Sequence, residues 1–151
     1  MRLRIYTDTS VLGGCEDEEF RDPSRRLVET FERGERILVL SELTLQELET
    51  APEAVRRVLG RIPAAHIETL ALSPEGDELA AAYISDGAIV ARMRADALHI
   101  ALATIARVDV LVSWNFKHIV NLRRIHAYNA VNLKKGYPLL EIRTPREVAD
   151  E

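Results

Sequence analysis

The sequence predicts an α/β fold: a single domain over residues 1–151, with a central, mostly parallel sheet flanked by helices on both faces. Short aliphatic runs alternate along the chain with amphipathic segments, which is typical of strand and helix alternation. Several of these runs are continuously aliphatic, as in parallel strands that are buried on both faces. The length is that of one ordinary domain, and no linker, internal repeat or low-complexity tract divides it.

Five runs are expected to form strands. The first alternates in polarity and ends at Asp8, and two later runs are continuously aliphatic. In chain order the five are RLRIYTD at residues 2 to 8, RILVLS at 36 to 41, HIETLAL at 66 to 72, VDVLVS at 108 to 113, and LLEIR at 139 to 143.

Capping residues mark the helices between these runs. The segment DPSRRLVETFERG is expected to start with Asp22 as N-cap and Pro23 in the first turn. In TLQELETA, Thr44 and Glu47 match a capping box. Further helices are expected from Pro52 to residue 60, over SPEGDELAAAYISDG with Ser73 as N-cap and Gly87 as the stop, over residues 95 to 107, and after Asn115.

Composition excludes several classes of protein. With 47% hydrophobic and 29% charged residues of both signs, the chain is expected to be a soluble globular protein rather than a disordered one. Its single cysteine, Cys15, cannot form an internal disulfide, and the acidic residues that follow it disfavour a reactive thiolate. No signal-like or membrane-spanning apolar segment is visible, so we expect a cytoplasmic location and no membrane association.

Charge is distributed unevenly along the chain. The net charge is −4, yet residues 116 to 140 contain no acidic residue at all. Lys117, Arg123 and Arg124 lie in this stretch and are candidates for contacts with the phosphates of a nucleic acid. A solvated helix face explains the same pattern unless a nuclease site lies beside it.

Oxygen-bearing side chains follow the predicted strands. Asp8 ends the first strand, Glu47 lies beyond the second, and Asn115 follows the run that ends at residue 113, while Asp96 opens the preceding helix. Because ligands of open α/β sheets bind beyond the carboxyl ends of the strands, these side chains are expected to converge. A cluster of carboxylates without a Cys/His set suits Mg²⁺ or Mn²⁺, which can activate water against a phosphodiester.

Each residue also has a local explanation. Asp8 can cap a following helix, Glu47 fits the capping box, and Asp96 suits the first turn of a helix. His99 is left out of the predicted site, because an isolated histidine more often satisfies a backbone or water partner. Trp114 is expected to pack rather than to stack on a base.

Four segments taken together resemble the PIN-domain family and, within it, VapC-like toxin ribonucleases. They are IYTDTSVL, LTLQELE, RADALHIALA and LVSWNFKHI, and the similarity extends through the C-terminal part of the chain. The resemblance implies a metal-dependent ribonuclease that acts as the toxin of a type II toxin–antitoxin pair. It also implies an RNA substrate, a cognate antitoxin and a homodimer.

Matched by position, the family's acidic residues fall on Asp8, Glu47 and Asp96, which the resemblance makes the metal ligands. The fourth acidic position holds Asn115, a neutral residue that would complete the catalytic set. Ser10 stands where the family commonly has Asn, and it joins the three cations Lys117, Arg123 and Arg124 as a substrate-binding candidate.

Two alternatives remain beside the ribonuclease. Because Asn115 supplies no charge, the chain can be a catalytically degenerate PIN domain that binds RNA or protein without cutting. An aspartate-nucleophile phosphatase also begins with an acid after its first strand, but that chemistry needs a second Asp where Ser10 stands.

Overall fold

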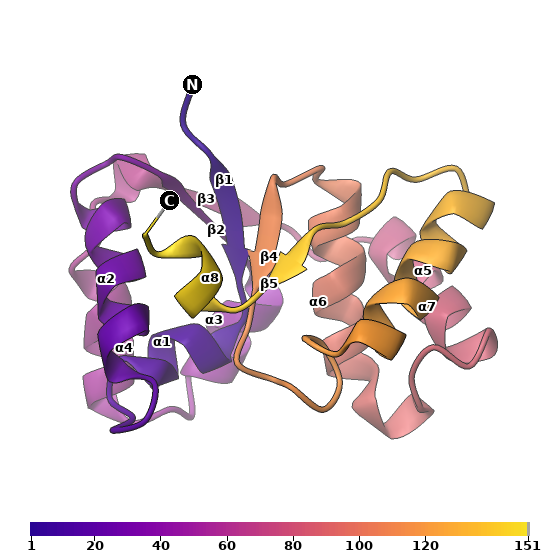
Figure 1. Cartoon of the computed structure of the whole chain (residues 1–151), viewed down its shortest axis with the longest axis horizontal. Helices are drawn as coiled ribbons and strands as arrows, with labels where there is room; N and C mark the ends of the chain where they lie inside the picture. The colour runs from indigo at the N-terminus through magenta and orange to yellow at the C-terminus, as the bar shows by residue number, and fades with distance from the viewer. Residues whose placement is uncertain (151) are drawn as a thin grey trace.

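The computed structural model describes residues 1–150 as one three-layer α/β/α domain (Figure 1). Its five strands form a sheet in the order β3-β2-β1-β4-β5, and every neighbouring pair is parallel. The predicted α/β class is therefore confirmed, and all the strands of the sheet run in one direction. The strands are β1 (Arg4–Thr7), β2 (Ile37–Ser41), β3 (Ile67–Leu70), β4 (Val110–Val112) and β5 (Ile142–Arg143).

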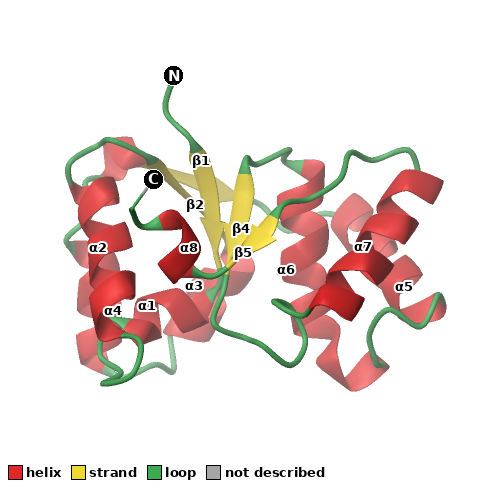
Figure 2. Ribbon diagram, in the orientation of Figure 1, coloured by secondary structure: helices red, strands yellow, loops and turns green. Residues whose placement is uncertain are grey.

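Helices cover both faces of the sheet, and each face has its own core. In Figure 2, α1 (Thr9–Gly14), α2 (Arg21–Glu32) and α4 (Glu53–Gly60) lie on one side, and α5 (Pro74–Ser85), α6 (Arg94–Ile105) and α7 (Leu122–Lys134) lie on the other. Side chains alternate along each strand, so Ile5 enters the core of the first side while Tyr6 enters that of the second. The remaining helices are α3 (Glu42–Leu48), α8 (Pro145–Val148) and the short 3₁₀ turns η1 (Ala64–His66) and η2 (Ala91–Met93).

Two helix starts differ from the predicted ones. The expected N-cap Asp22 lies inside the first turn of α2, which begins two residues earlier than predicted, at Arg21, with Phe20 as its N-cap. The capping box of α3 is formed by Ser41 and Thr44, not by Thr44 and Glu47. The helix starts directly at the end of β2, so Thr44 takes the N3 position and Glu47 lies a turn further on.

Cys15 is fully buried beside α1, and burial raises the pKa of its thiol to about 11. The prediction of an unreactive cysteine agrees with this position, although burial rather than the acidic neighbours is the main cause. Within residues 1–150, no helix is both long enough and apolar enough to cross a membrane.

Candidate active site

The carboxylate of Asp8 is held between two serines at the end of β1. Ser10 Oγ donates to Asp8 Oδ1 at 2.6 Å, and Ser113 Oγ donates to Oδ2 at 2.7 Å. The two hydroxyl oxygens in turn accept the backbone N–H groups of Trp114 and Asn115, both at 2.9 Å. Asp8 occupies the N-cap position of α1 but makes no capping hydrogen bond, so the local explanation of this residue as a helix cap is wrong.

Glu47 reaches the same edge of the sheet from α3. One of its oxygens, Oε1, accepts from Thr9 Oγ1 at 2.7 Å and from His99 Nε2 at 2.9 Å. Its other oxygen, Oε2, has no hydrogen-bond donor among residues 1–150. The capping-box explanation of Glu47 is wrong, because Ser41 and Thr44 form that box without it.

His99, which sequence reasoning left out, lies at the centre of the site. Its imidazole is 2% exposed, and Nδ1 lies 2.6 Å from Tyr6 Oη. Tyr6 Oη is in turn 2.8 Å from Ser41 Oγ, the cap of α3. The one signal in the sequence is that His99 follows Asp96 by three residues, which places both on one face of a helix.

Asn115 contacts Asp96 and also closes the turn that follows it. Its Nδ2 donates to Asp96 Oδ2 at 3.2 Å, and its Oδ1 accepts the backbone N–H of His118 at 2.9 Å. The residues after Asn115 form a turn, and the next helix, α7, starts only at Leu122 with Asn121 as its cap. The helix expected after Asn115 therefore begins only after this turn, and the Asn115 side chain contacts the third carboxylate of the site.

Burial and mutual repulsion set the charge states of the carboxylates. Burial raises the pKa of Asp8, the charge of His99 and the two serine hydroxyls oppose this, and Asp96 raises it further. Burial also raises the pKa of Asp96, whereas His99, His118 and the Asn115 amide lower it by a smaller amount. For Glu47, burial raises the pKa, but His99 and Thr9 outweigh it and leave the pKa below its ordinary value. His99 is thus a neighbour that the three acids share.

Trp114 packs beside this cluster, as predicted. Its indole Nε1 donates to Ser24 Oγ at 2.8 Å, and its ring stacks on Phe20 with the centroids 4.2 Å apart. Phe116 contacts both rings and is half exposed. Together the three aromatic rings hold the loop after β4 against the start of α2.

The basic residues after Asn115 divide into two groups. Arg124 donates to the carbonyl oxygen of Ala88 at 2.6 Å and so links α7 to the loop after α5. Lys117 and Arg123 are exposed. A contact with substrate stays a prediction for all three cations, and Arg124 already has a structural contact.

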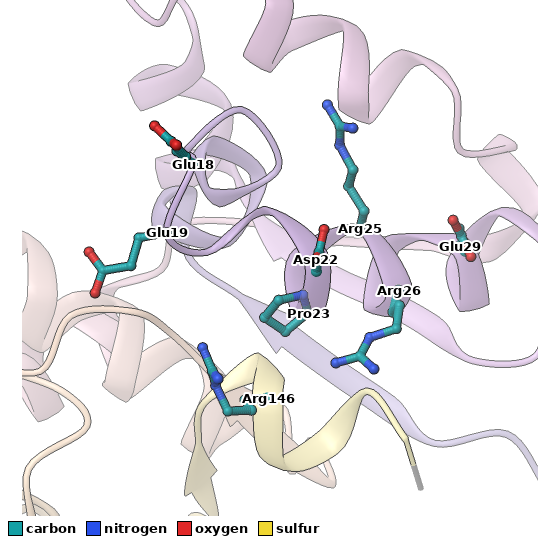
Figure 3. A pocket seen from close by; sticks show the side chains of 8 residues that line it. All are labelled: Glu18, Glu19, Asp22, Pro23, Arg25, Arg26, Glu29 and Arg146. Atoms are coloured by element: carbon teal, nitrogen blue, oxygen red, sulfur yellow. The ribbon is translucent and has the colours of Figure 1, made fainter.

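A surface cleft of about 570 Å³ lies elsewhere, between α2, the loop before it and α8 (Figure 3). Glu18 and Glu19 project from the loop, Arg25 and Arg26 from α2, and Arg146 from α8. The side chains that line this cleft carry charges of both signs, which largely offset one another. No predicted site residue lines it. We therefore place the candidate active site at the carboxylates and not in this cleft.

The donor set of the site fits a hard divalent cation. Carboxylate oxygens are the ligands that Mg²⁺ and Mn²⁺ prefer, and Glu47 Oε2 and Asp96 Oδ1 accept no hydrogen bond in the described part of the chain. As the side chains stand, however, no group of three or more His, Cys, Asp or Glu residues that could hold a metal ion occurs within residues 1–150. Metal binding is therefore a proposal for this site.

Comparison with solved structures identifies the fold. Mycobacterium tuberculosis VapC20, a toxin that cleaves the Sarcin-Ricin loop, superimposes with a TM-score of 0.57 at 14% identity over 76% of this chain and 92% of its own. Rickettsia felis VapBC2, solved with a DNA fragment from its promoter, gives a TM-score of 0.58 at 16% identity over 94% of this chain and 98% of its own. No protein-family model and no curated protein sequence matches the chain. The chain thus has a PIN-type, VapC-like fold.

Proposed function

We propose that this protein is a divalent-metal-dependent ribonuclease of PIN type and the toxin of a type II toxin–antitoxin pair. One observation carries the proposal: Asp8, Glu47 and Asp96 come from β1, α3 and α6 and approach one another at the carboxyl edge of a VapC-like sheet. Buried acids raise one another's pKa, so a cluster of this kind suits a site that receives a cation.

In this proposal Asp8 and Asp96 are the principal ligands of Mg²⁺ or Mn²⁺, and Glu47 is a further ligand or orients the attacking water. When bound by these residues, such a cation would lower the pKa of that water and neutralise charge on the phosphoryl group. Ser10 and Ser113 hold the Asp8 carboxylate in place for this task. Lys117 and Arg123, which are exposed just beyond the site, contact the RNA backbone.

The proposed partners follow from the same likeness. Rickettsia felis VapBC2 was solved on promoter DNA. By analogy we propose a cognate antitoxin for this chain, a homodimeric toxin and a cytoplasmic location. Co-expression with the product of a short reading frame directly upstream, followed by co-purification and mass measurement, tests the antitoxin and the dimer together.

The ribonuclease activity is tested with a mixed RNA pool and the full-length chain. We expect cleavage with Mn²⁺ that is abolished by EDTA and by Asp8→Asn, since this variant removes a principal ligand. Asp22→Asn, an exposed acid in the first turn of α2, is the matched control and should cleave like the wild type. If calorimetry shows Mn²⁺ binding that Asp8→Asn does not weaken, the assignment of the metal site is wrong.

A second function is favoured by the contacts of Asn115. Its side-chain oxygen accepts from the His118 backbone N–H and its amide donates to Asp96, so its polar atoms already have partners and it brings the site no charge. A PIN domain that binds RNA or protein without cutting fits these contacts. It predicts no Mn²⁺-dependent cleavage by the wild type and cleavage by Asn115→Asp; clear cleavage by the wild type removes it.

A further inference from the structure

A chain of buried hydrogen bonds leads from the start of α3 to the Glu47 carboxylate. It runs from Ser41 Oγ to Tyr6 Oη, on to His99 Nδ1, and from His99 Nε2 to Glu47 Oε1, with successive distances of 2.8, 2.6 and 2.9 Å. Ser41, Tyr6 and His99 are each no more than 2% exposed. Four secondary-structure elements, β1, β2, α3 and α6, are joined by these contacts.

The position of one proton in this chain follows from counting donors. The Tyr6 hydroxyl has a single hydrogen, which it donates either to His99 Nδ1 or to Ser41 Oγ. The first arrangement leaves a neutral imidazole with its proton on Nε2, and the second requires an imidazolium. In both, Nε2–H points at the ionised Glu47 carboxylate, which can only accept.

This contact restrains a side chain that would otherwise be free to move. Glu47 is about one-third exposed, and a glutamate on a helix surface loses considerable rotamer entropy when one orientation is fixed. His99 and Thr9 both donate to the same oxygen, Oε1. The other oxygen, Oε2, accepts no hydrogen bond from residues 1–150.

We propose that His99 is a positioning residue that, held by Tyr6 and Ser41, fixes Glu47 so that one carboxylate oxygen stays available to the site. The inference rests on the proposed function, since it assigns His99 a task in the metal-binding carboxylate cluster. Outer-shell partners of this kind orient metal ligands and support affinity without touching the metal. His99 reaches the reaction only through Glu47.

Tyr6→Phe tests the inference, with Tyr83→Phe as its matched control. Both tyrosines are fully buried and both lose a hydroxyl hydrogen bond, Tyr83 to Asn132 on the far side of α6. We expect similar drops in melting temperature for the two variants. Only Tyr6→Phe should weaken Mn²⁺ binding measured by calorimetry, by about tenfold, the lower end of the range for outer-shell partners.

Nuclear magnetic resonance of the ¹⁵N-labelled imidazoles supplies a readout that does not depend on metal. We expect a protonated, slowly exchanging His99 Nε2–H in the wild type and in Tyr83→Phe, and faster exchange in Tyr6→Phe. An unprotonated Nε2 in the wild type overturns the inference, as does equal Mn²⁺ affinity in the two variants. If the wild type binds no Mn²⁺, the proposed metal site falls, and the imidazole spectra alone decide whether His99 holds Glu47.

Discussion

Gly13 and Gly14 are adjacent in α1 and should respond to alanine in opposite directions. A Cβ added at Gly13 meets nothing within 4 Å. A Cβ added at Gly14 lies 2.5 Å from Ser24 Oγ and 2.8 Å from Trp114 Nε1, the two atoms of the hydrogen bond that anchors the indole. Neither glycine has a positive φ, so backbone strain does not separate the two substitutions.

The magnitudes follow from these contacts. Gly13→Ala should stabilise the fold by about 0.5–1 kcal/mol, the usual advantage of alanine over glycine within a helix. Gly14→Ala has the same advantage but forces an added methyl group against two buried side chains, which costs roughly 1–3 kcal/mol. Losing the bond between Trp114 and Ser24 costs about 1 kcal/mol more. We expect a net destabilisation of roughly 1–3 kcal/mol for Gly14→Ala.

Urea unfolding followed by circular dichroism measures both free energies of unfolding. Trp114 is the single tryptophan of the chain, so its fluorescence reports in parallel whether the indole has moved. A red shift of its emission is expected in Gly14→Ala and not in Gly13→Ala. Equal free energies of unfolding for the two variants would refute the reasoning, because the methyl group would then have been accommodated at no cost.

Three further predictions concern charge and reactivity. Burial raises the pKa of Asp8 and of Asp96, so the folded state binds protons at these two groups more tightly than the unfolded state does. The metal-free protein should therefore lose stability as the pH rises from the ordinary pKa of 3.8 through the raised pKa values. The urea midpoint of Asp8→Asn should fall less over this pH range than that of the wild type, and parallel curves would contradict the prediction. Asn115→Asp should bind Mn²⁺ about tenfold more tightly than the wild type in calorimetry. This corresponds to about 1.4 kcal/mol of binding free energy, well below the gross attraction of one added charge. Unchanged affinity would show that residue 115 does not contact the metal. Cys15 should resist a thiol reagent at pH 8 until the protein is unfolded with urea, because the thiol is fully buried and burial raises its pKa to about 11; rapid labelling of the native protein would contradict this.

The fold and the convergence of the carboxylates could be predicted from the sequence. Strand and helix alternation predicts a parallel sheet, and a parallel sheet brings the residues that follow its strands to one edge. Asp8 after β1 and Ser113 after β4 therefore meet although they are far apart in the chain. The helix over Pro74–Ser85, with Ser73 as its cap, was also predictable, because Ser, Pro and the distant Gly87 mark both of its ends.

The contacts of the individual side chains could not be predicted in the same way. For His99, the sequence shows a helix face but not that the Tyr6 hydroxyl lies behind it, which depends on the packing of α6 against β1. For Glu47, a capping box with Thr44 was a sound local interpretation, and it failed because α3 begins immediately after β2 at Ser41. Local sequence patterns predict the helix or strand in which a polar residue lies, but its hydrogen-bond partner comes from a neighbouring element and depends on the tertiary packing.

The two serines around Asp8 differ in one respect from the backbone amides that often surround a buried carboxylate. An amide hydrogen is fixed by the plane of the peptide, but a hydroxyl hydrogen can rotate about its C–O bond. Ser10 and Ser113 can thus turn their hydrogens away from Asp8 while their oxygens keep the N–H bonds of the loop after β4. In the proposed function, the Asp8 carboxylate would exchange these two donors for a cation by rotation of the serine hydroxyls.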